Sequence, residues 1–331
     1  MRCCSYGSYL IYRGERVLRH MKNGKKIIIA VPHGFCAGVR RALETVEKAL
    51  ELYGKPVYVR HEIVHNEYIV DALSGKGVVF LESISKLPKK SHLVFSAHGV
   101  SPEIEDDAVA KGLDIIDATC PLVKKIHLQA VSYATKGFAI IIIGHRKHPE
   151  VVGTAGQIDD SFIVESLKDV EKLPAIAQKR IACLTQTTLS ADDTRDIICA
   201  IKKKFRGRRI AVLNDICYAT QNRQNAVKAL AKKCDAVFVI GSENSSNANR
   251  LREVAEKAGT KAYLISGEKE PSPKILKGLG KIGISAGAST PEVLISKFIS
   301  FLNKKGWHDI ETVGNEEKKI VFRLPARFAG E

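Results

Sequence analysis

Three cysteines in this chain each follow a short apolar run and precede a segment with helical periodicity. Cys120 shows the pattern best: the apolar run ends at Ala118, and Pro121 opens the segment that follows. Proline suits the first position of a helix, because the N–H that it lacks would have no partner there. The same arrangement recurs at Cys36 and Cys217. A cysteine at a helix N-terminus is favoured as a thiolate, the form that binds metals.

Apolar runs typical of buried strands alternate with helical segments along the whole chain, which predicts βαβ units and parallel sheets. The pattern restarts about every 90 residues, so we expect three similar α/β domains. The predicted division is an extension at 1–24, domains at 25–120, 121–216 and 217–306, and a tail at 307–331 with a late strand at 319–323.

Polar residues stand directly after several of the predicted strands. Open α/β sheets bind ligands at the carboxyl ends of their strands. If pseudo-threefold symmetry brings these ends together, the three cysteines meet in one closed polar cavity. The surrounding ring would consist of His65, His98, His148, Glu150, Thr187, Ser245, Ser246, Asn247 and Ser289.

Three thiolates favour either zinc or an iron–sulfur cluster. Structural zinc and most iron–sulfur clusters use four protein ligands. A cubane held by three cysteines leaves one iron open, and an open iron can bind a substrate as a Lewis acid. The histidine, serine and asparagine side chains, together with helix N-termini, suit a diphosphate. Glu150 is the only carboxylate in this set, so it is the natural proton source if the site raises its pKa.

Each of these residues also has an ordinary explanation on its own. A lone cysteine is commonly a buried structural residue, and Ser-Ser-Asn commonly forms a turn or a helix cap. We predict structural roles for Cys183, Cys199 and Cys234, and none in the compact fold for Cys3 and Cys4. The segment 278–283 matches GxGxxG but precedes a strand, so we reject it as a dinucleotide site.

The chain of 331 residues carries 52 Lys and Arg against 36 Asp and Glu, a formal net charge of +16. Such a charge favours an anionic partner. Because the charge is spread and aromatic residues make up only 6%, a small anion is favoured over nucleic acid. No apolar stretch approaches the ~20 residues of a membrane span, and the N-terminus lacks the apolar core of a secretory signal. We expect a cytoplasmic protein with reduced cysteines and no membrane partner.

Eight motifs surround the predicted site residues. They are GFCAGV at 34–39, VRHEIVHN at 59–66, ATCPLV at 118–123, GHRKHPE at 144–150, TQTTLS at 185–190, DICYATQNRQ at 215–224, SSN at 245–247 and AGAS at 286–289. Taken together, these motifs closely resemble the 4-hydroxy-3-methylbut-2-enyl diphosphate reductase family, also called LytB, which performs the last step of the non-mevalonate isoprenoid pathway. The resemblance runs in order from about residue 25 to the C-terminal tail.

The resemblance implies a three-domain trefoil around one 4Fe–4S cluster per chain, held by Cys36, Cys120 and Cys217, whose fourth iron binds the substrate hydroxyl. It implies that Thr187 and Glu150, with His148 beside them, relay a proton to this hydroxyl, which leaves as water. Two electrons, from a ferredoxin or flavodoxin, then give isopentenyl or dimethylallyl diphosphate. The implied diphosphate ligands are His65, His98, His148, Ser245, Ser246, Asn247 and Ser289.

Two alternatives remain open from the sequence. A basic binding protein could use the cysteines for structural zinc, and its signs would be zinc without iron and salt-sensitive RNA binding. An iron–sulfur dehydratase could use a three-cysteine cluster without net redox chemistry. A requirement for an external reductant separates the reductase from the dehydratase.

Overall fold

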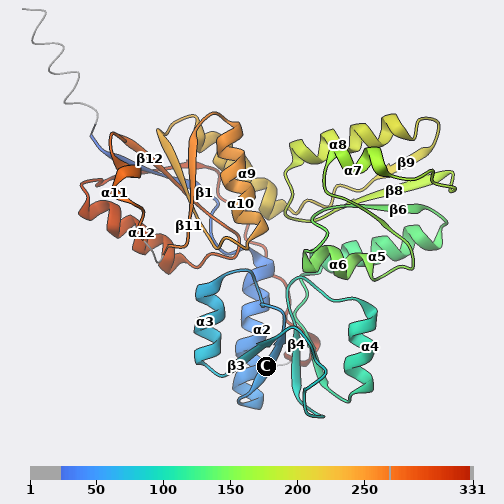
Figure 1. Cartoon of the computed structure of the whole chain (residues 1–331). Coiled ribbons are helices and arrows are strands. Elements are labelled where there is room, and N and C mark those ends of the chain that lie inside the picture. Colours follow the sequence, from blue (N-terminus) through green and yellow to red (C-terminus); the bar gives the residue numbers. More distant parts are fainter. Residues whose placement is uncertain (1–23, 268–269, 329–331) are drawn as a thin grey trace, which may run out of the picture.

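The computed structural model describes residues 24–267 and 270–328, which form three lobes around a common centre (Figure 1). The predicted extension, with Cys3 and Cys4, lies outside the described residues except for Gly24. Within these two ranges, no helix combines the length and apolar composition that crossing a membrane requires.

The first lobe is built on a parallel sheet with strand order β3-β2-β4-β5. Its strands are β2 (Val57–Arg60), β3 (Val78–Leu81), β4 (His92–Phe95) and β5 (Asp114–Asp117). Its helices are α2 (Ala37–Tyr53), α3 (Glu67–Gly75) and α4 (Pro102–Ala110).

The second lobe repeats this plan with strand order β7-β6-β8-β9, again all parallel. Its strands are β6 (Ala139–Ile143), β7 (Phe162–Val164), β8 (Arg180–Thr185) and β9 (Arg209–Val212). Its helices are α5 (Pro121–Thr135), α6 (Pro149–Ala155), α7 (Leu167–Lys172) and α8 (Ala191–Lys204).

The third lobe contains a larger parallel sheet with strand order β11-β10-β12-β1-β13. Its strands are β1 (Lys26–Val31), β10 (Ala236–Ile240), β11 (Lys261–Ile265), β12 (Lys281–Ala286) and β13 (Asp309–Gly314). Its helices are α9 (Tyr218–Ala231), α10 (Ser246–Lys257), α11 (Pro273–Leu276) and α12 (Glu292–Lys304).

Apolar composition explains why the central strands form where the sequence predicts them. Every residue of β6 and of β10 is buried, because helices cover both faces of a parallel sheet. A strand that is buried on both faces has a continuous run of apolar residues, and such a run predicts both β6 and β10 from the sequence. The prediction of three α/β units with parallel sheets is confirmed.

The first and last strands lie outside the units to which the sequence division assigned them. β1, predicted in domain 25–120, pairs with β12 and β13 of the third lobe, and β13 comes from the predicted tail. The reason lies in the repeat itself. In the first two lobes, β5 and β9 belong to the preceding sheet and lead into the next cysteine. β1 holds the same position in the third sheet, so the start of the chain completes its last unit.

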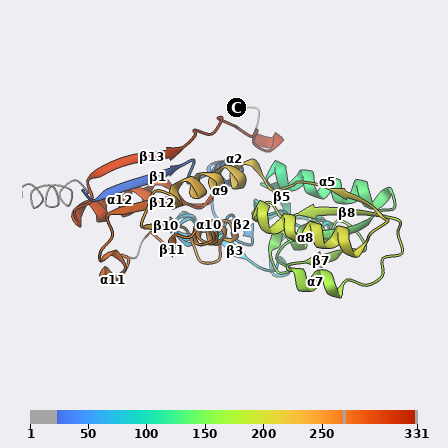
Figure 2. The same cartoon turned by 90° about the horizontal axis from the view of Figure 1, so that it is seen from above.

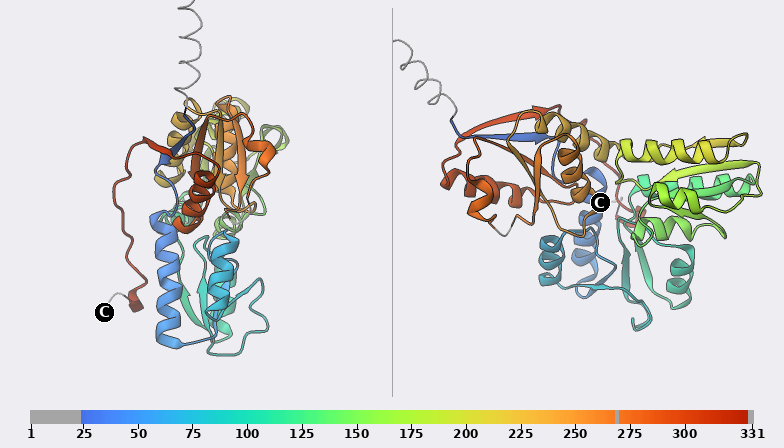
Figure 3. Two further views of the ribbon diagram at one scale, coloured as in Figure 1. Left: turned by 90° about the vertical axis from the view of Figure 1, so that its left-hand side faces the viewer. Right: turned by 45° about the horizontal axis from the view of Figure 1, so that its top comes forward.

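The predicted strand at 319–323 is wrong, because this segment has no strand pairing and Val321 is 77% exposed. Residues 315–328 instead form an extended strap that leaves β13 and runs along α2 to the short helix η1 (Ala326–Phe328) (Figures 2 and 3). At the far end, Phe328 is buried in the core of the first lobe and Leu324 packs against it. The strap therefore connects the third lobe with the first.

The placement of β1 predicts where a core mutation acts. Ile27 is fully buried among side chains of β10 and β12, so Ile27→Ala should cost about 2–5 kcal/mol. Hydrogen exchange should accelerate at the amides of β10 and β12 and stay at the wild-type rate in β2 and β4. Val59→Ala, in the first-lobe core, is the matched control with the opposite pattern. Faster exchange in β2 after Ile27→Ala would contradict the assignment.

Candidate functional site

The structure brings the three predicted cysteines together at one pocket. Each stands at the N-cap of a helix: Cys36 before α2, Cys120 before α5 and Cys217 before α9. The Cys36 sulfur accepts a hydrogen bond from the Val39 amide, and the Cys217 sulfur accepts one from the Thr220 amide. Three helix N-termini therefore direct their positive ends toward the same space.

The backbone amide of each cysteine is hydrogen-bonded to a neighbouring loop of the site. Cys36 N–H donates to the Ala288 carbonyl at 3.1 Å, and Cys120 N–H donates to the Ala97 carbonyl at 3.0 Å. Cys217 N–H donates to the Thr187 carbonyl at 3.2 Å. Ser289 and His98 directly follow the first two carbonyls, so the backbone fixes each thiol relative to a predicted polar site residue.

Gly38, in the first turn of α2, leaves room for the sulfurs. A Cβ at this position would lie 2.7 Å from the Cys120 sulfur and 3.8 Å from the Cys36 sulfur. Burial raises the pKa of the Cys120 thiol to about 12 and that of the Cys217 thiol to about 11. Within the described part of the chain, no three His, Cys, Asp or Glu side chains are arranged to hold one metal ion.

Most of the predicted polar ring lines the same pocket. The predicted residues that line the pocket are His65, His98, His148, Glu150, Thr187, Ser245, Asn247 and Ser289. Ser246 does not line it; its hydroxyl lies 2.9 Å from that of Thr188 instead. Gly38 and Thr188 also line the pocket, and neither is among the predicted site residues. Both lie inside the quoted motifs, which is the one signal that could have identified them.

The three histidines form a contiguous cluster on one side of the pocket. The rings of His65 and His98 stack with centroids 4.2 Å apart, and His148 meets them edge-on at 5.3 and 5.6 Å. Burial, reinforced by the other histidines, holds the pKa of His98 well below its usual range. Burial likewise lowers the pKa of His148 to about 3. His98 and His148 are therefore neutral at pH 7, and each can donate one N–H to a ligand.

Asn247 presents the clearest sign of a ligand-binding site. It lies in the first turn of α10 and is 5% exposed, and neither its amide nitrogen nor its amide oxygen has a partner among the described residues. Buried polar atoms are rarely left without a hydrogen bond. Ser245, at the N-cap of α10, accepts a bond from Ala248 N–H. A helix N-terminus with an unpartnered amide is suited to binding an anion.

Glu150 and Thr187 form a buried acid–hydroxyl pair. The Glu150 carboxylate accepts bonds from the Thr187 amide at 2.6 Å and from the Thr187 hydroxyl at 2.8 Å. Burial raises the pKa of Glu150 to about 7; the bonds from Thr187 oppose this shift, and nearby Asp215 adds to it. Near neutral pH, Glu150 thus populates both its acid form and its carboxylate form, as a proton donor at this pH requires.

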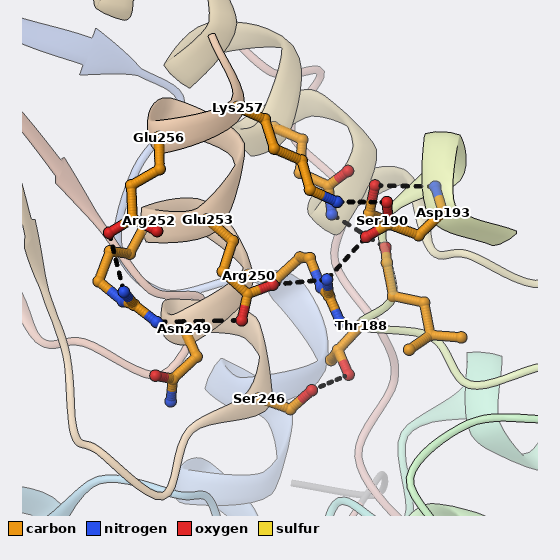
Figure 4. Close-up of polar contacts among 12 residues, drawn as sticks. Thr188, Ser190, Asp193, Ser246, Asn249, Arg250, Arg252, Glu253, Glu256 and Lys257 are labelled. Carbon is orange, nitrogen blue, oxygen red and sulfur yellow. Dashed lines mark hydrogen bonds and ion pairs between the residues drawn. The ribbon is translucent and has the colours of Figure 1, made fainter. Parts of the chain in front are cut away.

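Contacts between the second and third lobes hold the Thr187 loop against α10 (Figure 4). Beyond the Thr188–Ser246 contact, Arg250 of α10 pairs with Asp193 of α8 at 2.8 Å, and Lys257 pairs with the same carboxylate. The Glu150–Thr187 pair and the α10 N-terminus are thereby fixed relative to each other.

The other described cysteines lie away from this pocket. Cys183 is fully buried in β8, where burial raises its pKa to about 12, and this supports the predicted structural role. Cys199 is exposed on α8, and Cys234 lies just beyond the end of α9. The segment 278–283 forms the turn before β12 and the first residues of that strand, consistent with its rejection as a dinucleotide site.

A sequence model of the family described as LytB protein matches residues 27–303, which is most of the chain. The chain belongs to the LytB family. The 4-hydroxy-3-methylbut-2-enyl diphosphate reductase 2 of Bradyrhizobium diazoefficiens is 49% identical over 305 residues, covering 92% of this chain and 99% of that protein. The 4-hydroxy-3-methylbut-2-enyl diphosphate reductase of Methylococcus capsulatus is 48% identical over 304 residues, covering 91% and 97%.

Solved structures agree with this membership. The structure of the E-1-hydroxy-2-methyl-but-2-enyl-4-diphosphate reductase from Plasmodium falciparum matches with a TM-score of 0.89 at 39% identity, covering 92% of this chain and 97% of that chain. A structure of (E)-4-hydroxy-3-methyl-but-2-enyl diphosphate reductase gives a TM-score of 0.62 at 33% identity, covering 85% and 99%. The resemblance seen in the motifs is confirmed, and so is the expectation of a reductase enzyme.

The raised pKa of Glu150 predicts a pH dependence of stability in this LytB protein. Between about 4.5, its usual pKa, and about 7, Glu150 is neutral in the folded chain and ionised in the unfolded chain. Folding then binds a proton, so stability falls as pH rises through this range. The free energy of unfolding of the wild type, minus that of Glu150→Gln, should fall from pH 4.5 to 7 and then level off. Denaturant titrations across this range measure it, and a flat difference would contradict the shift.

Proposed function

We propose that this LytB protein converts 4-hydroxy-3-methylbut-2-enyl diphosphate into isopentenyl and dimethylallyl diphosphate by reductive dehydroxylation. The reaction consumes two electrons and two protons and releases the hydroxyl as water. One observation carries the proposal: the three cysteine thiols, the Glu150–Thr187 pair and the unpartnered Asn247 amide line one pocket. The names of the relatives support the choice of substrate.

The residues around the cysteines fit an iron–sulfur cluster held by Cys36, Cys120 and Cys217. Cysteine thiolates are the ligands that iron–sulfur clusters use, and the missing side chain of Gly38 leaves the space beside two of the sulfurs open. When bound, a cluster with three protein ligands supplies electrons and an iron that is open to the substrate hydroxyl.

The diphosphate would bind on the histidine side of the pocket. Neutral His98 and His148 can each donate an N–H to the diphosphate. Because these side chains carry no charge, the pocket does not incur the free-energy cost of burying a histidinium ion. Asn247 and the N-terminus of α10 add donors from the third lobe. Ser289 completes the set; its hydroxyl now donates to the His65 carbonyl at 3.0 Å and can turn to the ligand.

Proton delivery falls to Glu150 and Thr187. In its acid form, Glu150 donates to the Thr187 hydroxyl 2.8 Å away, and that hydroxyl can in turn donate to the substrate oxygen. The Thr187 amide bond to Glu150 holds the carboxyl in the required orientation. Protonation turns a poor leaving group into water. His148 caps the start of α6 by accepting a bond from Glu150 N–H, so it also positions the acid.

A dehydratase remains the second candidate because it could use the same cysteine arrangement. The relatives are named as reductases, which favours net reduction.

We further propose that a reduced ferredoxin or flavodoxin in the cytoplasm supplies the electrons, since acidic partners of this kind suit a net charge of +16.

An anaerobic assay with the diphosphate and a chemically reduced viologen tests this function. The wild type should oxidise the viologen only when the substrate is present. Glu150→Gln should keep its iron and lose turnover by roughly 10²–10⁴-fold, because the proton donor is gone. Glu165→Gln is the matched control: Glu165 accepts a bond from Arg146 N–H outside the central pocket, and turnover should stay at the wild-type level. Unchanged turnover in Glu150→Gln, or substrate loss without reductant, would contradict the proposal.

A further inference from the structure

Arg223 is the bulkiest fully buried side chain among the described residues, and it connects two of the cysteine segments. It lies on α9, the helix that Cys217 opens. Its Nε and Nη2 donate to the Gly34 carbonyl at 3.2 and 2.9 Å, just before Cys36. Its Nη1 donates to the Ala219 carbonyl at 2.9 Å, in the first turn after Cys217. One guanidinium thus ties the start of α9 to the loop that delivers Cys36.

Arg41 makes the corresponding connection one segment further on. It lies on α2, the helix that Cys36 opens. Its Nη1 donates to the Thr119 carbonyl at 3.0 Å, and its Nη2 donates to the Asp117 carbonyl at 3.3 Å. Thr119 directly precedes Cys120, so Arg41 ties the helix behind Cys36 to the loop that delivers Cys120.

A third basic residue, Lys125, connects the remaining pair of cysteine segments through a longer contact. Lys125 lies on α5, the helix that Cys120 opens, and its Nζ is 4.0 Å from the Asp215 carboxylate. Asp215 stands just before Cys217. In all three lobes, a basic side chain of a cysteine-capped helix therefore reaches the loop before the next cysteine. The Lys125 side chain is 59% exposed, so this third contact is the weakest of the set.

The strap of residues 315–328 contacts both arginines. The Glu317 carboxylate accepts from Arg223 Nη1 at 3.4 Å and from Asn222 Nδ2 at 2.9 Å. The Arg323 carbonyl accepts from Arg41 Nε at 2.7 Å. Figure 3 shows the strap running beside α2. Because the strap is anchored by buried Phe328, it restrains both guanidinium groups.

We propose that Arg223, Arg41 and Lys125 are positioning residues that hold the three cysteines at the spacing an iron–sulfur cluster needs, with the strap keeping both arginines in place. The inference rests on the proposed function, in which these cysteines hold the cluster. Side chains that hold the segments behind metal ligands orient those ligands, and their loss typically weakens metal binding by 10–100-fold. From the strength of the three contacts, we expect Arg223 to contribute most to holding the cysteines, Arg41 less and Lys125 least.

The test is the rate at which the loaded full-length chain loses iron to a ferrous chelator without oxygen. Arg223→Met should release iron about tenfold faster or more, Arg41→Met less so, and Lys125→Met least. Arg223→Lys should be intermediate, since an ammonium can still donate to Gly34. The electron paramagnetic resonance spectrum of the reduced cluster should change in the same order. If Arg223→Met does not fold, Glu317→Gln provides the test, with a smaller acceleration.

Arg208→Met is the matched control. Arg208 also binds backbone carbonyls, those of Ala177 and Gln178, but at the amino ends of β8 and β9, the strand ends opposite to the loop that carries Cys217. Its iron release and spectrum should equal those of the wild type. Wild-type rates and spectra in both Arg223→Met and Arg41→Met would overturn the inference, as would equally fast release from Arg208→Met. A wild-type chain that binds no iron would overturn the proposed function itself.

Discussion

The hydrogen bonds from the three cysteine amides to the loops of the site are the interactions on which the rest of the structure depends. Each one satisfies a helix N-terminal N–H that has no partner within the helix itself. Each also fixes a thiol beside a polar side chain: Ser289, His98 or Thr187. Because the backbone makes these bonds, they do not depend on which side chains contact the ligand. The parallel sheets supply the loops, and the sheets end at the common centre.

Burial then gives the polar residues their chemistry. The same water-poor pocket keeps His98 and His148 neutral and brings the pKa of Glu150 to about 7. Exposed to solvent, these groups would keep ordinary pKa values, and the glutamate would be a carboxylate with no proton to give at neutral pH. The burial of these side chains is therefore part of the proposed mechanism.

The sequence predicts the local features of this fold well because they arise from short-range patterns. Continuous apolar runs mark β6 and β10, and Pro121 marks the start of α5. Long-range pairing leaves no such local trace, which is why the sequence predicts β1 in the first lobe and a strand in the exposed segment 319–323. The motifs predicted most of the pocket lining, whereas the turn of Ser246 toward Thr188 depends on the contact between two lobes. The roles of these residues remain predictions.

The most direct test of the central claim is the amount of iron and acid-labile sulfide per chain in protein purified without oxygen. The account predicts about four of each, as a 4Fe–4S cluster held by three cysteines requires. Zinc in place of iron, or a folded chain with no metal, would contradict it and would leave the three cysteines with a structural role.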